Sequence, residues 1–342
     1  MIRRIKNAST ATCTLPIYMG FLMTEPNSIS CTQLAETYNI SHDSVNRFLE
    51  REDYTPHDLY QEAIQHIDNN KLIVSIDDTV LDKPYSQHMD LVSYFWSGKH
   101  HRSVKGINLI TLYATDQNGQ NIPINFRIYD KSEGKTKNDY FMDMLSEVLS
   151  WGAKIQFITG DSWYSSTGNL KTIRKYGIRF MFGIDCNRKV SPEKGQWFQL
   201  RLLPNFHQGQ VVWLKDFGFV QLFKTQLKEQ QRFYIVHQDE DDLLSFEGFH
   251  ELHSSHWKIE QYHRVIKQVC HIEKFQVRRS KLILNHIFSA LMAYVEIQKN
   301  QFEGIFENVY RWQKKLFRPI IKDFIDDFIL DKNHLLPQRI YK

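Results

Sequence analysis

The feature that most constrains the fold is the order of strand and helix patterns from residue 71 onward. Runs rich in β-branched and aromatic residues indicate strands, whereas apolar residues three or four positions apart indicate helices. The runs that predict strands are KLIVSIDD (71–78), GINLITLYATD (106–116), NIPINFRIYD (121–130), KIQFITGD (154–161) and IRFMFGID (178–185). Helical spacing covers residues 138–150 and 169–176. The turn sequence DQNG at 116–119 joins the second and third runs, so the first three strands are expected to form a meander.

This order predicts an α/β protein with a ribonuclease-H-like core, because few other folds begin with three strands, a helix, a strand, a helix and a strand. The pattern breaks at residues 186–231, where prolines, glycines and short aromatic strands predict a β-rich insertion. A strand at 232–238 and a long helix over roughly 249–270 would then complete the core. Helical spacing continues at 282–300 and 305–330.

We therefore expect a core that is divided by an insertion and flanked by helices at both ends. The expected parts are an N-terminal helical region (1–68), the first part of the core (70–185), the insertion (186–231), the remainder of the core (232–282) and a C-terminal helical region (283–342).

The composition is that of a globular protein and excludes several classes. Charged residues make up 24% and hydrophobic residues 42%, which argues against a disordered, collagen-like or coiled-coil chain. No apolar run reaches about 18 residues, so we expect no membrane span. The four cysteines form no CxxC pair, which supports neither a zinc ribbon nor a disulfide framework. A net charge of +4 permits a polyanionic partner without requiring one.

Residues 28–50 predict two short helices joined by a tight turn at Asn39, with Ser41 capping the second helix. This pattern is typical of a helix-turn-helix, and an ordinary helical hairpin is the alternative. The second helix would present five polar residues outward: His42, Asp43, Ser44, Asn46 and Arg47. Arg47 is the predicted DNA contact in this region.

Acidic residues follow two of the predicted strands. Asp77 and Asp78 end the first strand and Asp161 ends the fourth, and these strands are neighbours in a ribonuclease-H-like sheet. Carboxylates brought together in this way need cations, and Mg²⁺ prefers carboxylate oxygen. Two such ions can activate an attacking oxygen and stabilise a leaving oxygen in phosphoryl transfer. A third acid, Glu260, lies on the long helix; solvated acids at strand ends are the simpler alternative.

The long helix places Glu260 on a face with potentially cationic residues. His253, His256, His263 and Lys267 share this face at helical spacing. The opposite face carries Ile259, Tyr262, Ile266 and Val269, which can pack against the sheet. Such a stripe could bind metal through the acid and phosphate through the bases. A solvated helix face or a zinc site built from His253, His256 and Glu260 are the alternatives.

The segments IDDT (76–79), ITGDSWY (158–164) and HWKIEQYHRVIK (256–267) resemble bacterial insertion-sequence transposases of the DDE type. They resemble in particular the branch whose last helix carries a Tyr-x2-Arg-x3-Glu-x6-Lys signature. The resemblance covers about residues 70–282, and the order and spacing of the three segments are what make it specific.

The resemblance implies that Asp78, Asp161 and Glu260 are the catalytic acids and the ligands of Mg²⁺, for which Mn²⁺ can substitute. Asp78 takes the first position because the acid of the family directly precedes Thr, and Asp77 is its neighbour. Lys267 has the position of the signature Lys, whereas His256 and His253 replace its Arg and Tyr. His256 cannot form the bidentate contact of Arg with phosphate. The predicted DNA contacts are His253, His256, Trp257, Arg264, Lys267, Arg47, Lys135 and Lys137.

The activity implied is cut-and-paste transposition, in which strand cleavage and strand transfer use one acidic site. The partners implied are double-stranded DNA at the transposon ends and at the target, and a second copy of the chain in the DNA complex. The location implied is the bacterial cytoplasm, in association with the nucleoid. A purely hydrolytic nuclease of the same fold, and a transposase-derived DNA-binding protein without catalysis, are the other hypotheses.

Overall fold

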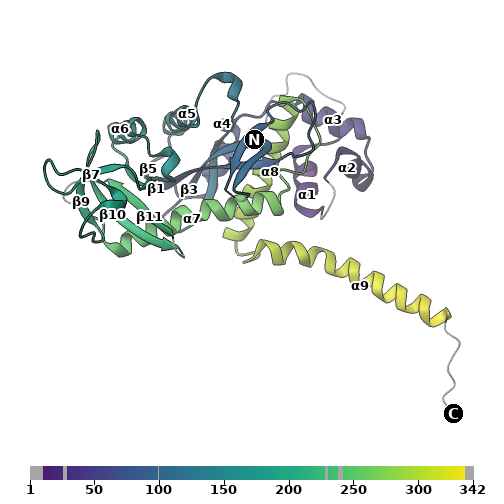
Figure 1. Ribbon diagram of the computed structural model, residues 1–342. Helices are drawn as coiled ribbons and strands as arrows, with labels where there is room; N and C mark the ends of the chain where they lie inside the picture. The colour runs from purple at the N-terminus through teal and green to yellow at the C-terminus, as the bar shows by residue number, and fades with distance from the viewer. Residues whose placement is uncertain (1–10, 26–28, 99, 228–229, 238–241, 336–342) are drawn as a thin grey trace, which may run out of the picture.

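The computed structural model describes residues 11–25, 29–98, 100–227, 230–237 and 242–335, and Figure 1 shows their arrangement. The first residues of the predicted N-terminal region (1–10), residues 26–28 and the C-terminal residues 336–342 lie outside the described chain. Within the described part, one mixed sheet is covered by helices on both faces and flanked by further helices at the two ends of the chain.

The strands confirm the predicted core. The strands of the core are β1 (Leu72–Asp82), β3 (Arg102–Thr115), β4 (Asn121–Ile128), β5 (Ile155–Gly160) and β6 (Arg179–Ile184). They lie in the order β4-β3-β1-β5-β6, with β1 antiparallel to β3 and parallel to β5, and with β3 antiparallel to β4 and β5 parallel to β6. This is the ribonuclease-H-like arrangement that the sequence predicts.

Two features of this core differ from the prediction. A further strand, β2 (Ser93–Ser97), pairs with the first residues of β3. β1 does not end at Asp78 but continues to Asp82, because its last residues pair with β3 as far as Gly106. The two adjacent acids therefore lie within the strand and not at its end.

The predicted insertion contains strands that extend the same sheet. They are β7 (Lys189–Ser191), β8 (Phe198–Gln199), β9 (Gln210–Leu214) and β10 (Gly218–Leu227). β11 (Gln230–His237) pairs antiparallel with β6 on one side and with β10 on the other. Hydrogen bonding thus continues without a break from the core into the insertion.

Helices cover both faces of the sheet. α5 (Lys137–Ser150) and α6 (Thr167–Lys175) lie over one face, and α7 (Phe246–Gln268) lies over the other (Figure 1). The predicted apolar face of α7 is buried against the sheet. Tyr262 of α7 stacks on Tyr113 of β3, with ring centroids 4.8 Å apart. This packing sets the height and rotation of α7, and therefore the position of Glu260.

The N-terminal helices are α1 (Leu15–Thr24), α2 (Cys31–Tyr38), α3 (His42–Arg51) and α4 (Pro56–Ala63), and α1, α3 and α4 pack against α8 (Ser280–Phe302). Asn39 adopts the left-handed conformation (φ 51°) between α2 and α3, as the turn pattern predicts. Ser44 was predicted to face outward and is buried, because its hydroxyl accepts hydrogen bonds from the backbone N–H groups of Thr12 and Cys13. His42, Asp43 and Arg47 are exposed.

The last helix, α9 (Val309–Leu335), leaves the body of the molecule and projects away from it (Figure 1). None of the helices in the described chain is both long enough and apolar enough to cross a membrane.

Candidate active site

The two acids of β1 are held by different elements. The Oδ2 atom of Asp77 lies 3.6 Å from Nδ1 of His263 on α7. Asp77 is paired with Thr111 of β3, whose hydroxyl lies 3.4 Å from the hydroxyl of Tyr262 on α7. Because successive side chains of a strand point to opposite faces, Asp77 faces α7 and Asp78 faces away from it.

Asp78 is surrounded by hydrogen-bond donors on its own side. Lys137, the first residue of α5, places its Nζ 2.7 Å from Oδ2 of Asp78. Asn108 donates to the same oxygen at 2.6 Å, and the hydroxyl of Tyr164 donates to Oδ1 at 2.9 Å. The ammonium group of Lys137 thus balances the negative charge of Asp78. A metal ion bound by Asp78 would be attracted to the same position.

Asp161 follows directly after β5, where the sequence places it. Its carboxylate caps the short 3-10 helix Ser162–Tyr164 by accepting from the N–H of Trp163 at 3.0 Å. Desolvation by the surrounding protein and the negative charge of Asp78 raise the pKa of Asp161 to about 6. This repulsion is what two carboxylates experience when they lie close together without a cation.

Glu260 is exposed on α7 and forms a group with Asp77 and His263. One ligand atom from each of these residues lies within 4.8 Å of the others. Burial, together with the charges of Asp78, Asp161 and Glu260, raises the pKa of Asp77 well above its ordinary value. Four carboxylates from β1, from the end of β5 and from α7 therefore converge on one place in the fold.

This donor set fits a divalent cation. Carboxylate oxygens are the ligands that Mg²⁺ prefers, and an added imidazole is also suited to transition metals. Burial lowers the pKa of His263 to about 3, so its ring is neutral and can offer a lone pair. The zinc alternative with His253 and His256 is not supported, because the group found among the described residues contains His263 in their place.

The two other histidines of the predicted stripe carry no charge at pH 7. Burial lowers the pKa of His256 to about 4, and its Nδ1 lies 3.2 Å from the hydroxyl of Thr159. Burial also lowers the pKa of His253, whose Nε2 lies 3.0 Å from the hydroxyl of Tyr234. The stripe is therefore less cationic than the sequence suggests, and both rings are held against the sheet.

The remaining residues that are predicted to contact DNA differ in their exposure and in the contacts that they make within the protein. Trp257 is 47% exposed, and Arg264 is exposed as well. Lys267 donates to the carbonyl of Val80 at 2.6 Å. Lys135 and Arg47 form exposed ion pairs with Asp143 (2.8 Å) and Asp43 (2.9 Å), while Lys137 is engaged by Asp78.

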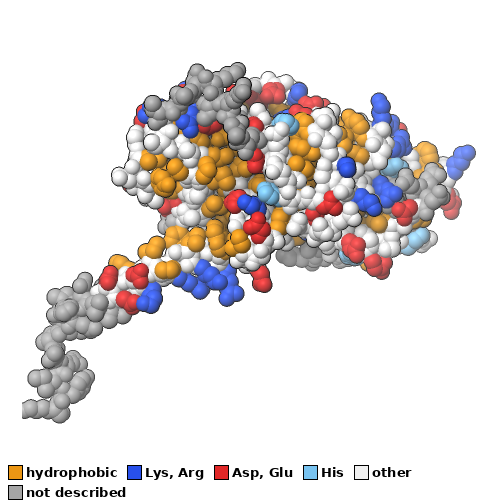
Figure 2. All heavy atoms as spheres, turned by 180° about the vertical axis from the view of Figure 1, so that it is seen from behind, with side chains coloured by type: hydrophobic (Ala, Val, Ile, Leu, Met, Phe, Trp, Pro, Cys, Tyr) orange, Lys and Arg blue, Asp and Glu red, His pale blue; other side chains and the backbone are white. Residues whose placement is uncertain are grey.

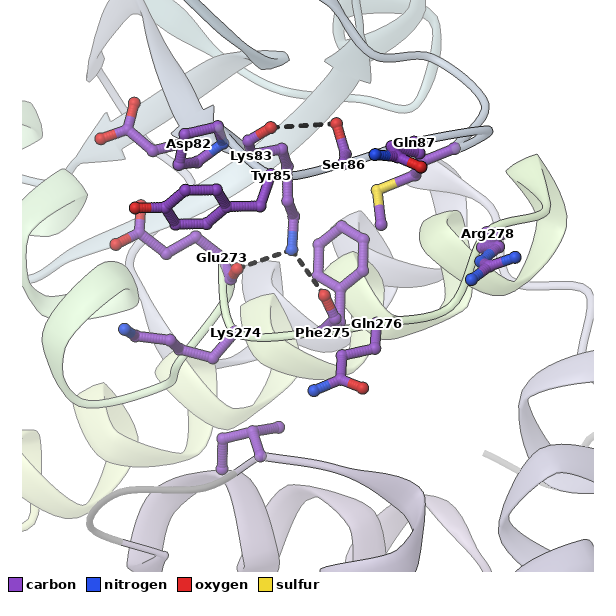
Figure 3. A pocket seen from close by; sticks show the side chains of 13 residues that line it. Asp82, Lys83, Tyr85, Ser86, Gln87, Glu273, Lys274, Phe275, Gln276 and Arg278 are labelled. Atoms are coloured by element: carbon purple, nitrogen blue, oxygen red, sulfur yellow. Dashed lines mark hydrogen bonds between the residues drawn. The ribbon is translucent and has the colours of Figure 1, made fainter.

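A hollow of about 590 Å³ lies beyond the end of β1, between residues 82–89 and residues 273–278. Figure 3 shows Lys83 pointing into the 273–275 segment, where its Nζ donates to the carbonyls of Glu273 and Phe275 at 2.7 Å. Tyr85, which is 94% exposed, lies at this hollow together with Lys274 and Arg278. An exposed aromatic ring beside two cationic side chains is chemistry suited to a nucleic-acid strand.

The sequence pattern places His263 on the face of Glu260, but it indicates neither the contact of Asp77 with His263 nor that of Lys137 with Asp78. From the sequence, Asp77 is only the neighbour of Asp78, and Lys137 is only a predicted DNA contact. The alternation of side chains along β1 could have indicated that the two acids serve opposite faces. Which residue contacts each acid depends on how α5 and α7 pack against the sheet, and the sequence pattern does not contain this information.

The strand order and the convergent carboxylates define a ribonuclease-H-like domain with an acidic group that could hold a metal ion. The family described as Transposase DDE domain matches residues 68–295, and the chain belongs to this family. No curated protein matches the chain.

One similar solved structure is the Argonaute of Marinitoga piezophila in complex with a 5′ OH guide RNA and target DNA. It is 10% identical over 59% of this chain and 28% of that chain, with a TM-score of 0.22. The match spans less than a third of that protein, and a likeness this low carries no argument about fold or function.

Proposed function

We propose that this chain is a DNA transposase that uses Mg²⁺, or Mn²⁺ in its place, to cleave a strand at a transposon end and to transfer that end to target DNA. The observation that carries the proposal is the convergence of Asp77, Asp78, Asp161 and Glu260 from three segments far apart in the sequence. Membership of the transposase family supports the class of reaction.

Asp78, Asp161 and Glu260 are the proposed metal ligands and catalytic acids, and Asp77, which lies with Glu260 and His263, is the alternative to Asp78 as the first acid. These carboxylates would hold Mg²⁺, which would supply Lewis acidity for phosphoryl transfer. Asn108 and Tyr164 fix the orientation of the Asp78 carboxylate, and Lys137 balances its charge. His263 lies beside Asp77 and Glu260 and would offer a neutral nitrogen to the same ion.

The proposed DNA path runs along the exposed side of α7. Trp257 can stack on an unpaired base, and Arg264 and Lys267 can contact phosphates. The hollow beside Tyr85, Lys274 and Arg278 would accept the strand that leaves the acidic group. His253 and His256 would contribute only neutral hydrogen bonds, whereas Lys135 and Arg47 would contact the flanking duplex. Lys137 would join them when a metal ion takes over its contact with Asp78.

Two transposon ends must be held together for a cut-and-paste reaction, so the proposed active species is a homodimer on DNA. The proposed setting is the bacterial cytoplasm, with the nucleoid as the source of both transposon ends and target.

The test is cleavage and joining of a labelled DNA end that flanks the gene, with Mg²⁺ or Mn²⁺ as the added ion. The decisive variants are Glu260→Gln and the matched pair Asp78→Asn and Asp77→Asn, each removing one negative charge without changing size. We expect Glu260→Gln and Asp78→Asn to lose both cleavage and joining, with DNA binding retained. An active Asp78→Asn beside an inactive Asp77→Asn would overturn the proposed role of Asp78 and assign it to its neighbour.

One observation favours a second function. His256, at the position of the signature Arg, is neutral and bonded to Thr159, which would weaken the grip on a terminal phosphate. A transposase-derived DNA-binding protein would bind the labelled end but leave it intact with every metal. A hydrolytic nuclease would cleave the end without joining it to target DNA.

A further inference from the structure

The edge strand β2 presents two large aromatic side chains to solvent. Tyr94 is 64% exposed and Trp96 is 67% exposed, whereas Phe95 between them is buried. Because successive side chains of a strand point to opposite faces, Tyr94 and Trp96 lie next to each other on one face, and Phe95 anchors the strand through the other. We call Tyr94 and Trp96 the β2 aromatic pair.

Exposed apolar side chains alone do not identify a binding surface on this molecule. Figure 2 shows hydrophobic side chains at several places on one face of the body, as is usual for folded proteins. The β2 aromatic pair differs in its chemistry, because tyrosine and tryptophan combine a flat apolar ring with a polar atom at its edge. A partner with flat apolar faces and polar edges fits such a surface, and a nucleobase has this shape.

The β2 aromatic pair lies on the face of the sheet that carries Asp77. Tyr94 is opposite Lys105 of β3, and Asp77 is opposite Thr111 of the same strand. Paired residues of an antiparallel ladder point to the same face, and so do residues of one strand that are an even number of positions apart. Lys105 and Thr111 are separated by 6 positions, which is about 20 Å along β3. The pair therefore lies within about six nucleotides of the acidic group.

The charges of this hairpin favour a polyanionic partner. Residues 93–105 contain no acidic residue, and their basic residues are Lys99, Arg102 and Lys105, together with two histidines. One acid from outside the segment, Asp82, contacts the hairpin through its Oδ2, which lies 3.2 Å from Nε2 of His100, and offsets part of this charge. The remaining balance is positive, which suits the phosphates of a nucleic acid.

A protein strand added to the edge of the sheet is the other partner that an exposed strand could take. Lys131 opposes this partner. Its Nζ donates to the carbonyl of Tyr94 at 2.8 Å and lies 4.8 Å from the centre of the Phe95 ring. A carbonyl of β2 is thus already engaged, and a lysine at a sheet edge disfavours strand addition. The observations therefore favour nucleic acid.

The spacing of the two rings selects an unpaired strand over a duplex. A β-strand advances about 3.3 Å per residue, so Tyr94 and Trp96 are about 7 Å apart along β2. Successive bases in each strand of B-DNA are only about 3.4 Å apart. Two bases that stack on these rings must therefore be separated from each other, which a flexible unpaired strand allows.

We propose that the β2 aromatic pair binds an unpaired DNA strand, with one base stacked on each ring and Lys105 beside its phosphates. The choice of DNA rests on the proposed function, which would bring an unpaired strand to the neighbouring acidic group. Lys105 also donates to the carbonyl of Ser86, which lines the hollow beside Tyr85. The pair therefore continues the path that we propose for the strand that leaves the acidic group.

Fluorescence anisotropy with a labelled oligothymidylate of about 12 nucleotides, in EDTA, tests this proposal without cleavage. Tyr94→Thr and Trp96→Thr each remove one ring and keep a residue that is suited to a strand. We expect each variant to weaken binding by about 5–150-fold, the range for one stacked base, with little change for a duplex of the same length. Trp197→Thr is the matched control, since Trp197 is 44% exposed but lies in the insertion.

Variants that keep a ring test the stacking separately from the fold. Tyr94→Phe and Trp96→Phe should bind the oligothymidylate nearly as well as the unmodified chain does. Stacking should quench part of the tryptophan fluorescence of the unmodified chain, and this quenching should be smaller in Trp96→Phe although its affinity is retained. Thermal unfolding verifies that all variants keep their fold.

Unchanged oligothymidylate binding in both Tyr94→Thr and Trp96→Thr would overturn the proposal, and an equal loss of duplex binding would overturn the preference for an unpaired strand. Cleavage and joining assays test the proposed function separately. A chain that binds through the β2 aromatic pair but never cleaves DNA would contradict the proposed function alone. A chain that cleaves and joins, and whose two variants bind normally, would contradict this inference alone.

Discussion

Asp77 and Asp78 are neighbours in β1, yet Asp77 contacts His263 on α7 while Asp78 contacts Lys137 on α5. Within the acidic group, β1 thus places one carboxylate on each face of the sheet. Both carboxylates are largely enclosed, with 17% and 16% of their side chains exposed. Their negative charges must therefore be balanced by groups of the protein or by added cations.

The ion pair between Lys137 and Asp78 is expected to stabilise the metal-free protein. Lys137→Met should lower the free energy of unfolding by about 1–3 kcal/mol, because a partly buried carboxylate loses its cation beside Asp161. Mg²⁺ should recover part of this loss by taking over the balancing charge. Urea unfolding with and without Mg²⁺ measures both effects. Lys135→Met is the control, since its pair with Asp143 is about half exposed and should contribute less than about 1 kcal/mol. Equal losses in the two variants would contradict the special position of Lys137.

The contact between Tyr18 and His286 should make stability depend on pH. The hydroxyl of Tyr18 lies 2.8 Å from Nδ1 of His286, and burial lowers the pKa of that ring from 6.5 to about 3. In the unfolded chain the ring takes up a proton near pH 6.5, so the unfolded state binds more protons between pH 6.5 and 3. Stability from this group is therefore present above pH 6.5 and is lost as the pH falls.

We expect a loss of about 1–2 kcal/mol from this histidine between pH 6.5 and about pH 5. Urea unfolding over this pH range should show a shallower pH dependence for His286→Leu than for the unmodified chain. His57→Leu is a control for the loss of a histidine on a different helix. An identical pH dependence in His286→Leu would show that His286 is protonated without cost in the folded state.

Asn285 should be the main hydrogen-bonding link between α8 and the end of α3. Its side-chain amide donates to the carbonyls of Leu49 and Glu52, both at 2.7 Å, and the residue is fully buried. Asn285→Leu would remove both of these buried hydrogen bonds and should lower stability by about 2–4 kcal/mol. Asn300→Leu, on the same helix but only partly buried, should cost less. Thermal unfolding compares the two, and equal shifts in Tm would contradict the assignment.

Trp257 should bind DNA without supporting the fold. Because its ring is 47% exposed, Trp257→Ala should leave the unfolding midpoint nearly unchanged. It should weaken binding to a DNA end with unpaired bases by about 1–3 kcal/mol, the contribution of one stacked base. Fluorescence anisotropy with paired and unpaired ends measures this, with Trp197→Ala in the insertion as the control. A loss of stability with unchanged affinity would identify Trp257 as a packing residue.

The order of elements could be predicted from the sequence because each strand and helix of the core carries its own periodicity. β5 and α5 lie within one residue of the ranges that the patterns indicate. The end of β1 could not be predicted from the sequence, because the pairing of its last residues with β3 is a tertiary contact. The small strand β2 was missed for the same reason.

The acidic group was only partly predictable. Asp161 and Glu260 could be found from their positions after a strand and on a helix. The charge state of His256 could not be predicted from the sequence. The pKa of this ring is low because the ring is buried, with its Nδ1 next to the hydroxyl of Thr159. The environment of Lys267 likewise depends on the approach of β1 to the end of α7.

The extended sheet also has consequences for aggregation. Open sheet edges invite pairing with other chains, and short or covered edge strands prevent it. In the described chain the outermost strand of the insertion, β8, has 2 residues, and β2 at the opposite end of the sheet has 5. The longer β4 is packed against α4. By joining its insertion to the core through β11, the molecule replaces the six-residue edge that β6 would present with an edge strand of two residues.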